Sequence, residues 1–120
     1  MSHTVQVKST VLTNRDCIER ARVRLGLPAL VEGTHKLFGN QSATGLALKL
    51  PGWNYPVVID AEGQAHYDNY NGSWGQEIEL DKLIQAYSVE VSADSLRNGG
   101  YTVEETVEND GLIQLVATQY

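Results

Sequence analysis

Two stretches of the chain repeat apolar residues every three or four positions, the spacing of a helix with one buried face. The first stretch predicts a helix over 14–25, introduced by Thr13–Asp16 in the shape of a capping box and ended by Gly26. The second predicts a helix from Leu80 to about Arg97, followed by two glycines. Each helix therefore offers one apolar stripe to a core.

Shorter segments rich in β-branched or alternating apolar residues predict strands. The first covers 3–12, and 45–50 is another. Segments 56–60 and 64–68 flank a glycine-containing turn and predict a tight hairpin. The stretch 29–43 is ambiguous and accommodates two short strands.

Residues 101–118 predict a closing hairpin around an Asn-Asp-Gly turn. A three-residue loop pairs Val107 with Ile113, so that the apolar side chains share one face of the hairpin. A two-residue loop would place Val107 opposite Gln114, so that apolar and polar side chains would share a face of the hairpin. A four-residue loop, which pairs Val107 with Leu112, is a further alternative. The elements together predict one α+β domain over 1–120, a mostly antiparallel sheet of five to six strands with two helices packed on one face.

Composition places the chain among globular domains. Its 120 residues are 42% apolar and 20% charged, enough to bury a core, and a single cysteine excludes an internal disulfide or a multi-cysteine metal site. No apolar run approaches the ~20 residues of a membrane span, and the N-terminus lacks the layout of a secretion signal. We therefore expect an intracellular protein that does not bind membranes.

Charge is distributed unevenly in this acidic chain, whose net charge is −6. Residues 1–55 contain seven basic and three acidic side chains, a net of +4, whereas residues 56–120 contain two and twelve, a net of −10. An acidic surface repels a phosphate backbone, so general nucleic-acid binding is not expected. The opposite signs of the two halves weakly favour a homo-oligomer.

Several short motifs resemble one family. They are the opening Met1–His3, the segment Tyr67–Gly75 leading to Leu83–Tyr87, Gly100–Val103, and Asp110–Leu115. Together they are similar to the hypothetical chloroplast reading frame thirty-five family, a domain of unknown function from plastids, cyanobacteria and some bacteriophages. The resemblance covers nearly the whole chain and is strongest from about residue 64 onward. It implies a single-domain cytoplasmic protein, in a bacterial or phage-host cytosol or a plastid stroma, and brings no catalytic residues.

The segment between the central hairpin and the second helix carries the most informative side chains. Its aromatic rings, with two from an earlier loop, suit stacking on a nucleobase or a hot spot for a protein partner, and its asparagines can donate and accept hydrogen bonds. The alternative is that some rings fill the core while the asparagines serve the turn. The candidate residues are Trp53, Tyr55, Tyr67, Asn69, Tyr70, Asn71 and Trp74.

Charged groups add two further candidates. Arg20 and Arg24 lie four apart on the first helix and can grip a phosphate or carboxylate, although a solvated helix face is the more frequent explanation. His66 and Asp68 share a strand face and, with Asp60 across the hairpin, can form a cation pocket. A solvated strand face with a hydrogen-bonded histidine is the favoured interpretation there.

We therefore expect a non-catalytic small binding protein that captures a nucleotide-like ligand through the aromatic and asparagine side chains and a helix arginine. In a bacteriophage this would suit sequestration of a host signalling nucleotide. The chain lacks a nucleophile elbow, a phosphate-binding loop and a dinucleotide fingerprint, so an enzyme is less expected, and no cofactor or metal is predicted. The alternatives are an accessory protein that docks on a protein partner through the same loop and, least favoured, a metal-dependent hydrolase using His66 and Asp68.

Overall fold

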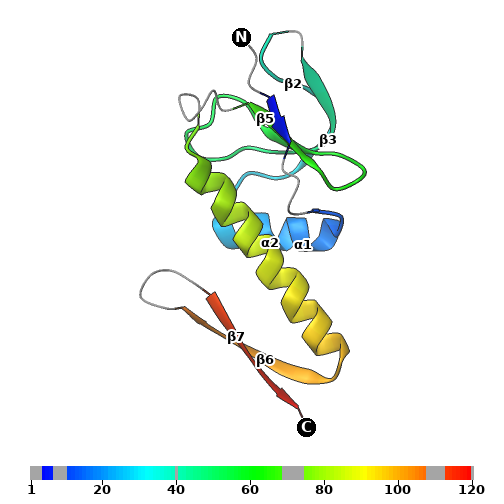
Figure 1. Ribbon diagram of the computed structural model, residues 1–120, viewed down its shortest axis with the longest axis vertical. Helices are drawn as coiled ribbons and strands as arrows, with labels where there is room; N and C mark the ends of the chain where they lie inside the picture. Colours follow the sequence, from blue (N-terminus) through cyan, green and yellow to red (C-terminus); the bar gives the residue numbers. More distant parts are fainter. Residues whose placement is uncertain (1–3, 7–10, 40, 69–74, 108–112, 120) are drawn as a thin grey trace.

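In the computed structural model, the described residues are 4–6, 11–39, 41–68, 75–107 and 113–119, and they form two helices and seven strands (Figure 1). Helices and antiparallel strands in this order make the fold α+β, as predicted. The elements are β1 (Thr4–Gln6), α1 (Arg15–Leu25), β2 (Val31–Lys36), β3 (Ser42–Leu48), β4 (Val57–Ile59), β5 (Ala65–Asp68), α2 (Glu77–Asn98), β6 (Tyr101–Val107) and β7 (Ile113–Gln119).

Five strands form one antiparallel sheet in the order β1-β5-β4-β3-β2. The predicted hairpin is present as β4 and β5, closed by the Gly63 N–H, which donates to the Asp60 carbonyl. The ambiguous stretch 29–43 contains β2, which runs through Gly33 instead of breaking there, and the first residues of β3, whereas Leu37 lies in the turn between the two strands. The partner of Gly33 in register is Gly45, and both glycines have positive φ values, which lets the ladder continue between them.

The prediction of a single sheet is corrected by β6 and β7, which pair with each other in a separate two-stranded sheet. Helix α2 has 22 residues, about 33 Å at 1.5 Å per residue, and only its first half lies over the five-stranded sheet. Figure 1 shows the hairpin lying alongside the other half of α2, away from the five-stranded sheet. The molecule is accordingly elongated, 54 × 31 × 24 Å.

The register of this hairpin agrees with the predicted pairing, because Val107 lies opposite Ile113 and Val103 lies opposite Ala117. Pairing of these apolar positions puts them on one face. The loop at 108–112 lies outside the described residues.

Helix α1 begins one residue later than predicted because Asn14, not Thr13, is its N-cap. The Asn14 side chain accepts a hydrogen bond from the Cys17 N–H at 3.1 Å, and Gly26 ends the helix in the left-handed conformation with φ 70°. Helix α2 begins at Glu77, three residues before the predicted start. Neither helix within the described residues has the length and apolarity to cross a bilayer.

The main core lies between the two helices and one face of the five-stranded sheet. Helix α1 and the first half of α2 each contribute an apolar stripe, and β3, β4 and β5 contribute alternate side chains. Its members are Leu12, Cys17, Ile18, Ala21, Leu27, Leu48, Leu50, Trp53, Val57, Ile59, Ala65, Tyr67, Leu80, Leu83, Ala86 and Tyr87.

Candidate functional site

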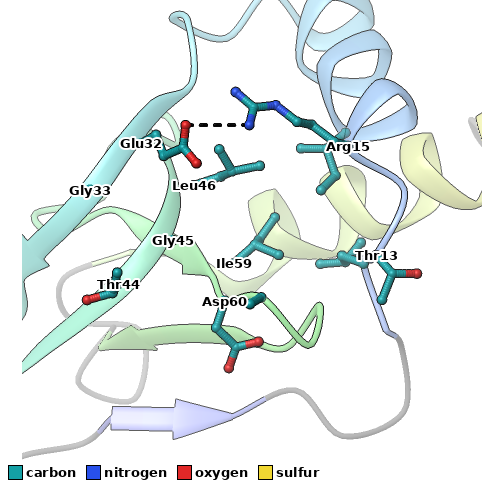
Figure 2. Close-up of a pocket in the computed structure, with 12 residues that line it drawn as sticks. Thr13, Arg15, Glu32, Gly33, Thr44, Gly45, Leu46, Ile59 and Asp60 are labelled. Carbon is teal, nitrogen blue, oxygen red and sulfur yellow. Dashed lines mark hydrogen bonds and ion pairs between the residues drawn. The ribbon is translucent and has the colours of Figure 1, made fainter.

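A cleft of about 340 Å³ opens between the start of α1 and the β2–β3 part of the sheet, and we call it the α1 cleft (Figure 2). Its floor is apolar and its rim is polar, the usual composition of a small-molecule site. The floor is formed by Leu12, Ile18, Leu46 and Ile59, and the rim by Thr13, Arg15, Glu32, Gly33, Thr44, Gly45, Asp60 and Ala61.

The cleft depends on glycine at one position of β3. A Cβ atom on Gly45 would overlap the Ile59 carbonyl group, so β3 and β4 can approach as they do only without a side chain there. At Gly33, directly across the ladder, a Cβ atom would meet open space. Gly45 therefore sets the spacing of the strands beneath the cleft, and Gly33 does not.

An exposed ion pair spans the mouth of the cleft. Arg15, the first residue of α1, places a guanidinium nitrogen 3.5 Å from Glu32, and the side chains are 62% and 69% exposed, respectively (Figure 2). A pair this exposed contributes at most about 1 kcal/mol, so the arginine can exchange Glu32 for a ligand. The N-terminus of α1 adds a partial positive charge beside Arg15. The mouth can thus attract an anionic group.

The carboxylate of Asp60, at the opposite end of the cleft in Figure 2, is already hydrogen-bonded within the β4–β5 turn. One of its oxygens accepts hydrogen bonds from the backbone N–H groups of Glu62 and Gln64, and the other lies 2.7 Å from His66 Nε2. Burial opposes ionisation of the Asp60 carboxyl, but the hydrogen bonds from His66 and Gln64 outweigh it and lower its pKa. Asp60 therefore stabilises the hairpin.

The same contacts bear on the predicted cation pocket. His66 and Asp60 do lie together across the hairpin, but as a hydrogen-bonded pair, and Asp68 is fully buried. In the parts of the chain that the structure describes, no group of three or more His, Cys, Asp or Glu side chains is arranged to hold a metal ion. The hydrogen-bonded histidine of the favoured interpretation is present, but the prediction of a solvated strand face is wrong because Asp68 is buried.

Arg20 and Arg24 lie together on α1, as their spacing predicts, but they face acidic residues of the same chain. Arg20 pairs with Asp94 and, at 3.3 Å, with Glu90. Arg24 pairs with the same Glu90 at 3.0 Å and with Glu105 of β6 at 2.7 Å. We call these five residues the arginine cluster.

The arginine cluster is a structural junction of α1, α2 and β6. The Glu90 side chain is only 12% exposed, and a carboxylate so poorly hydrated needs its cationic partners. The hydrogen bond from Arg24 lowers the pKa of Glu105, which keeps that carboxylate charged. The opposite charges of the two chain halves are thus paired within one molecule at this point, and the cations are not available for a phosphate.

Trp53 and Tyr67 are core residues, 2% and 4% exposed. Their rings meet edge to face with centroids 5.6 Å apart, and the Trp53 indole N–H donates to the Gln76 carbonyl at 3.0 Å. Gly75 lies against the indole so closely that a Cβ atom there would overlap the ring. Trp53 and Tyr67 therefore agree with the alternative prediction that some of the aromatic residues fill the core. The faces of their rings are not accessible to a ligand.

The arginines and Trp53 do not share a site. Trp53 contacts α2 at its N-cap, Gln76, whereas the arginines contact Glu90 and Asp94. Those contact points are 14 to 18 residues apart on one helix, about 21 to 27 Å along its axis. One nucleotide cannot bridge that separation.

Tyr55 is half-buried and has an interaction partner. Asn69, Tyr70, Asn71 and Trp74 lie outside the described residues, so their proposed role in binding stays a prediction. Cys17 is fully buried, and burial raises the pKa of its thiol, as expected for a packing residue.

Sequence reasoning missed the α1 cleft because its residues come from four separate segments. Arg15 belongs to the first helix but lies off the side shared by Arg20 and Arg24, and Thr44 and Leu46 look like ordinary strand residues. The available signal was the pair of glycines, 33 and 45, inside segments that otherwise alternate as strands.

Comparison of the chain with family models, with curated proteins and with solved structures finds no match in any of the three. The resemblance to the chloroplast reading frame family therefore stays a prediction.

Proposed function

We propose that this protein is a non-catalytic binding protein that holds a small anionic molecule in the α1 cleft. The observation that carries the proposal is the arrangement of Arg15 over an apolar floor, beside the N-terminus of α1. A volume of about 340 Å³ lies at the small end of the range for ligand sites, about 300–1,000 Å³.

The side chains of the cleft favour binding over covalent chemistry. Among the described lining residues there is no Cys, Ser, Lys or His, and the Asp60 carboxylate is engaged by the turn. Threonine hydroxyls at 13 and 44 can hydrogen-bond a ligand in either direction. A nucleophile in hydrogen-bonding contact with a general base, which covalent catalysis requires, is missing from this set.

The ligand class follows from the two ends of the cleft. The apolar surface of Leu46 and Ile59 suits a flat or aliphatic body, and Arg15 suits a phosphate or carboxylate. A nucleoside monophosphate combines these parts, and so does an aromatic carboxylic acid. A nucleotide-like ligand thus remains the proposal, with Arg15 in place of Arg20 and Arg24.

Isothermal titration calorimetry tests this directly. We expect a nucleoside monophosphate or an aromatic carboxylic acid to bind, and the uncharged nucleoside and inorganic phosphate alone to bind more weakly. Arg15→Gln removes a charge-assisted hydrogen bond of about 1.5–3 kcal/mol and should weaken binding about tenfold to a hundredfold. Leu46→Phe fills the floor and should weaken the binding of every ligand.

Arg97→Gln is the matched control. Arg97 is exposed near the C-terminal end of α2 and pairs only with its helix neighbour Asp94 among the described residues, so binding should be unchanged. Arg15 is also exposed, and both variants should melt within a few degrees of the unaltered protein. The proposal is refuted if no acid in the panel binds, or if Arg15→Gln binds as tightly as Arg97→Gln does.

A further inference from the structure

The closing hairpin presents an open sheet edge. Among the described residues, β6 and β7 pair only with each other, whereas an antiparallel sheet usually needs three strands or helix packing to be stable. One face of the hairpin lies toward the helices, with Glu105 bound to Arg24, and alternate apolar residues on that face are only half-buried. They are Tyr101, Val103, Ile113 and Leu115.

The two strands differ in how their edges are protected. Natural proteins place charges, prolines or bulges on exposed edge strands, because an open backbone edge recruits another strand. Strand β6 carries Glu104 and Glu105. Strand β7 reads Ile-Gln-Leu-Val-Ala-Thr-Gln, seven residues with no charge, proline or glycine. The β7 edge is therefore the unprotected one.

We propose that two copies of this chain join through their β7 strands, antiparallel about a twofold axis, to make one four-stranded sheet. A second copy suits this edge because an uncharged strand can meet itself without repulsion. The two β6 strands then form the outer edges, where their glutamates discourage further addition of strands. The assembly closes as a dimer, with the same surface used by both copies.

The register of this interface follows from the faces of the strand. A twofold axis perpendicular to the sheet leaves each side chain on the same face in both copies, so opposite residues must belong to one face. Full overlap of the seven residues places Val116 on the axis, against Val116 of the second copy. Val116 is 43% exposed in the single chain. Gln114 then lies opposite Thr118 of the second copy.

That last pairing allows a charge test specific to the register. Gln114 and Thr118 are both exposed, and within one chain they face Thr106 and Thr102, which are neutral. The double variant Gln114→Lys with Thr118→Lys sets like charges opposite each other twice across the axis. The double variant Gln114→Lys with Thr118→Glu sets opposite charges there instead.

Sedimentation equilibrium over a range of concentrations measures the outcome. We expect the unaltered protein to form a species of twice the 13.2 kDa chain mass. The like-charge variant should dissociate about tenfold more readily, and the opposite-charge variant should remain dimeric. Lysines at Thr102 and Thr106 of β6, on the same hairpin face, should leave the dimer intact. A chain that stays at 13.2 kDa throughout, or two charge variants that dissociate equally, overturns the proposal.

Discussion

Replacing Trp53 decides whether this ring is part of the core or a platform for ligands. Three contacts hold the indole: the edge of Tyr67, the Gln76 carbonyl and the backbone of Gly75. Removing a fully buried Trp side chain costs about 3–5 kcal/mol, because the transfer free energy is lost and a cavity remains. A domain of this size has a free energy of unfolding of about 5–15 kcal/mol. Trp53→Ala should therefore remove much of the stability.

Urea denaturation followed by far-UV circular dichroism gives the magnitude. With a slope of about 1.5 kcal/mol/M, a loss of about 4 kcal/mol lowers the unfolding midpoint by about 2.7 M. Trp53→Phe keeps an aromatic ring against Tyr67 but removes the N–H donor to Gln76, and should cost about 1.5 kcal/mol. This second variant keeps the measurement possible if Trp53→Ala does not fold.

Ile78→Ala is the control, because Ile78 is a large apolar residue in the first turn of α2 that is 55% exposed. Its change in the free energy of unfolding should stay within about 0.5 kcal/mol. If Trp53→Ala and Ile78→Ala unfold at the same midpoint, the core assignment is refuted and the indole must be regarded as a surface group.

Three further predictions concern glycine, acid and the arginine cluster. Gly45→Ala should lower the free energy of unfolding by about 3 kcal/mol and Gly33→Ala by about 1 kcal/mol, because only the Cβ atom at position 45 overlaps the backbone of Ile59. Equal losses of the two variants in urea titrations would contradict this. The lowered pKa of Asp60 means that its stabilisation is complete at neutral pH and disappears as the pH falls below about 4, so unfolding titrations should show a smaller acid loss in Asp60→Asn; parallel losses would count against the turn assignment. Arg24→Gln should cost about 2 kcal/mol and speed amide hydrogen exchange in β6 and β7 while β3 and β4 stay protected, and uniform exchange would exclude a junction role.

The sequence alone predicted both helices and the closing hairpin of this protein, whereas the strand predicted over 3–12 covers only Thr4–Gln6 among the described residues. Apolar spacing located both helices to within a few residues. Gly26 correctly predicted the end of the first helix, where the backbone adopts the left-handed conformation that glycine tolerates. The pairing of Val107 with Ile113 was also predictable, because a shift by one residue would turn the apolar side chains to the opposite face. Such features follow from the periods of helix and strand, which a short segment contains in full.

Which faces meet depends on contacts between segments that lie far apart in the chain. Nothing near Arg20 in the sequence indicates Asp94, 74 positions away, and nothing near Trp53 indicates the Gln76 carbonyl. The division into two sheets likewise depends on where α2 leaves the first sheet, and the α1 cleft exists because Arg15, Glu32, Leu46 and Ile59 arrive from different segments. Burial and charge pairing result from contacts between distant segments. A pattern within one segment can therefore indicate a candidate residue but cannot predict whether that residue is buried or which residue it pairs with.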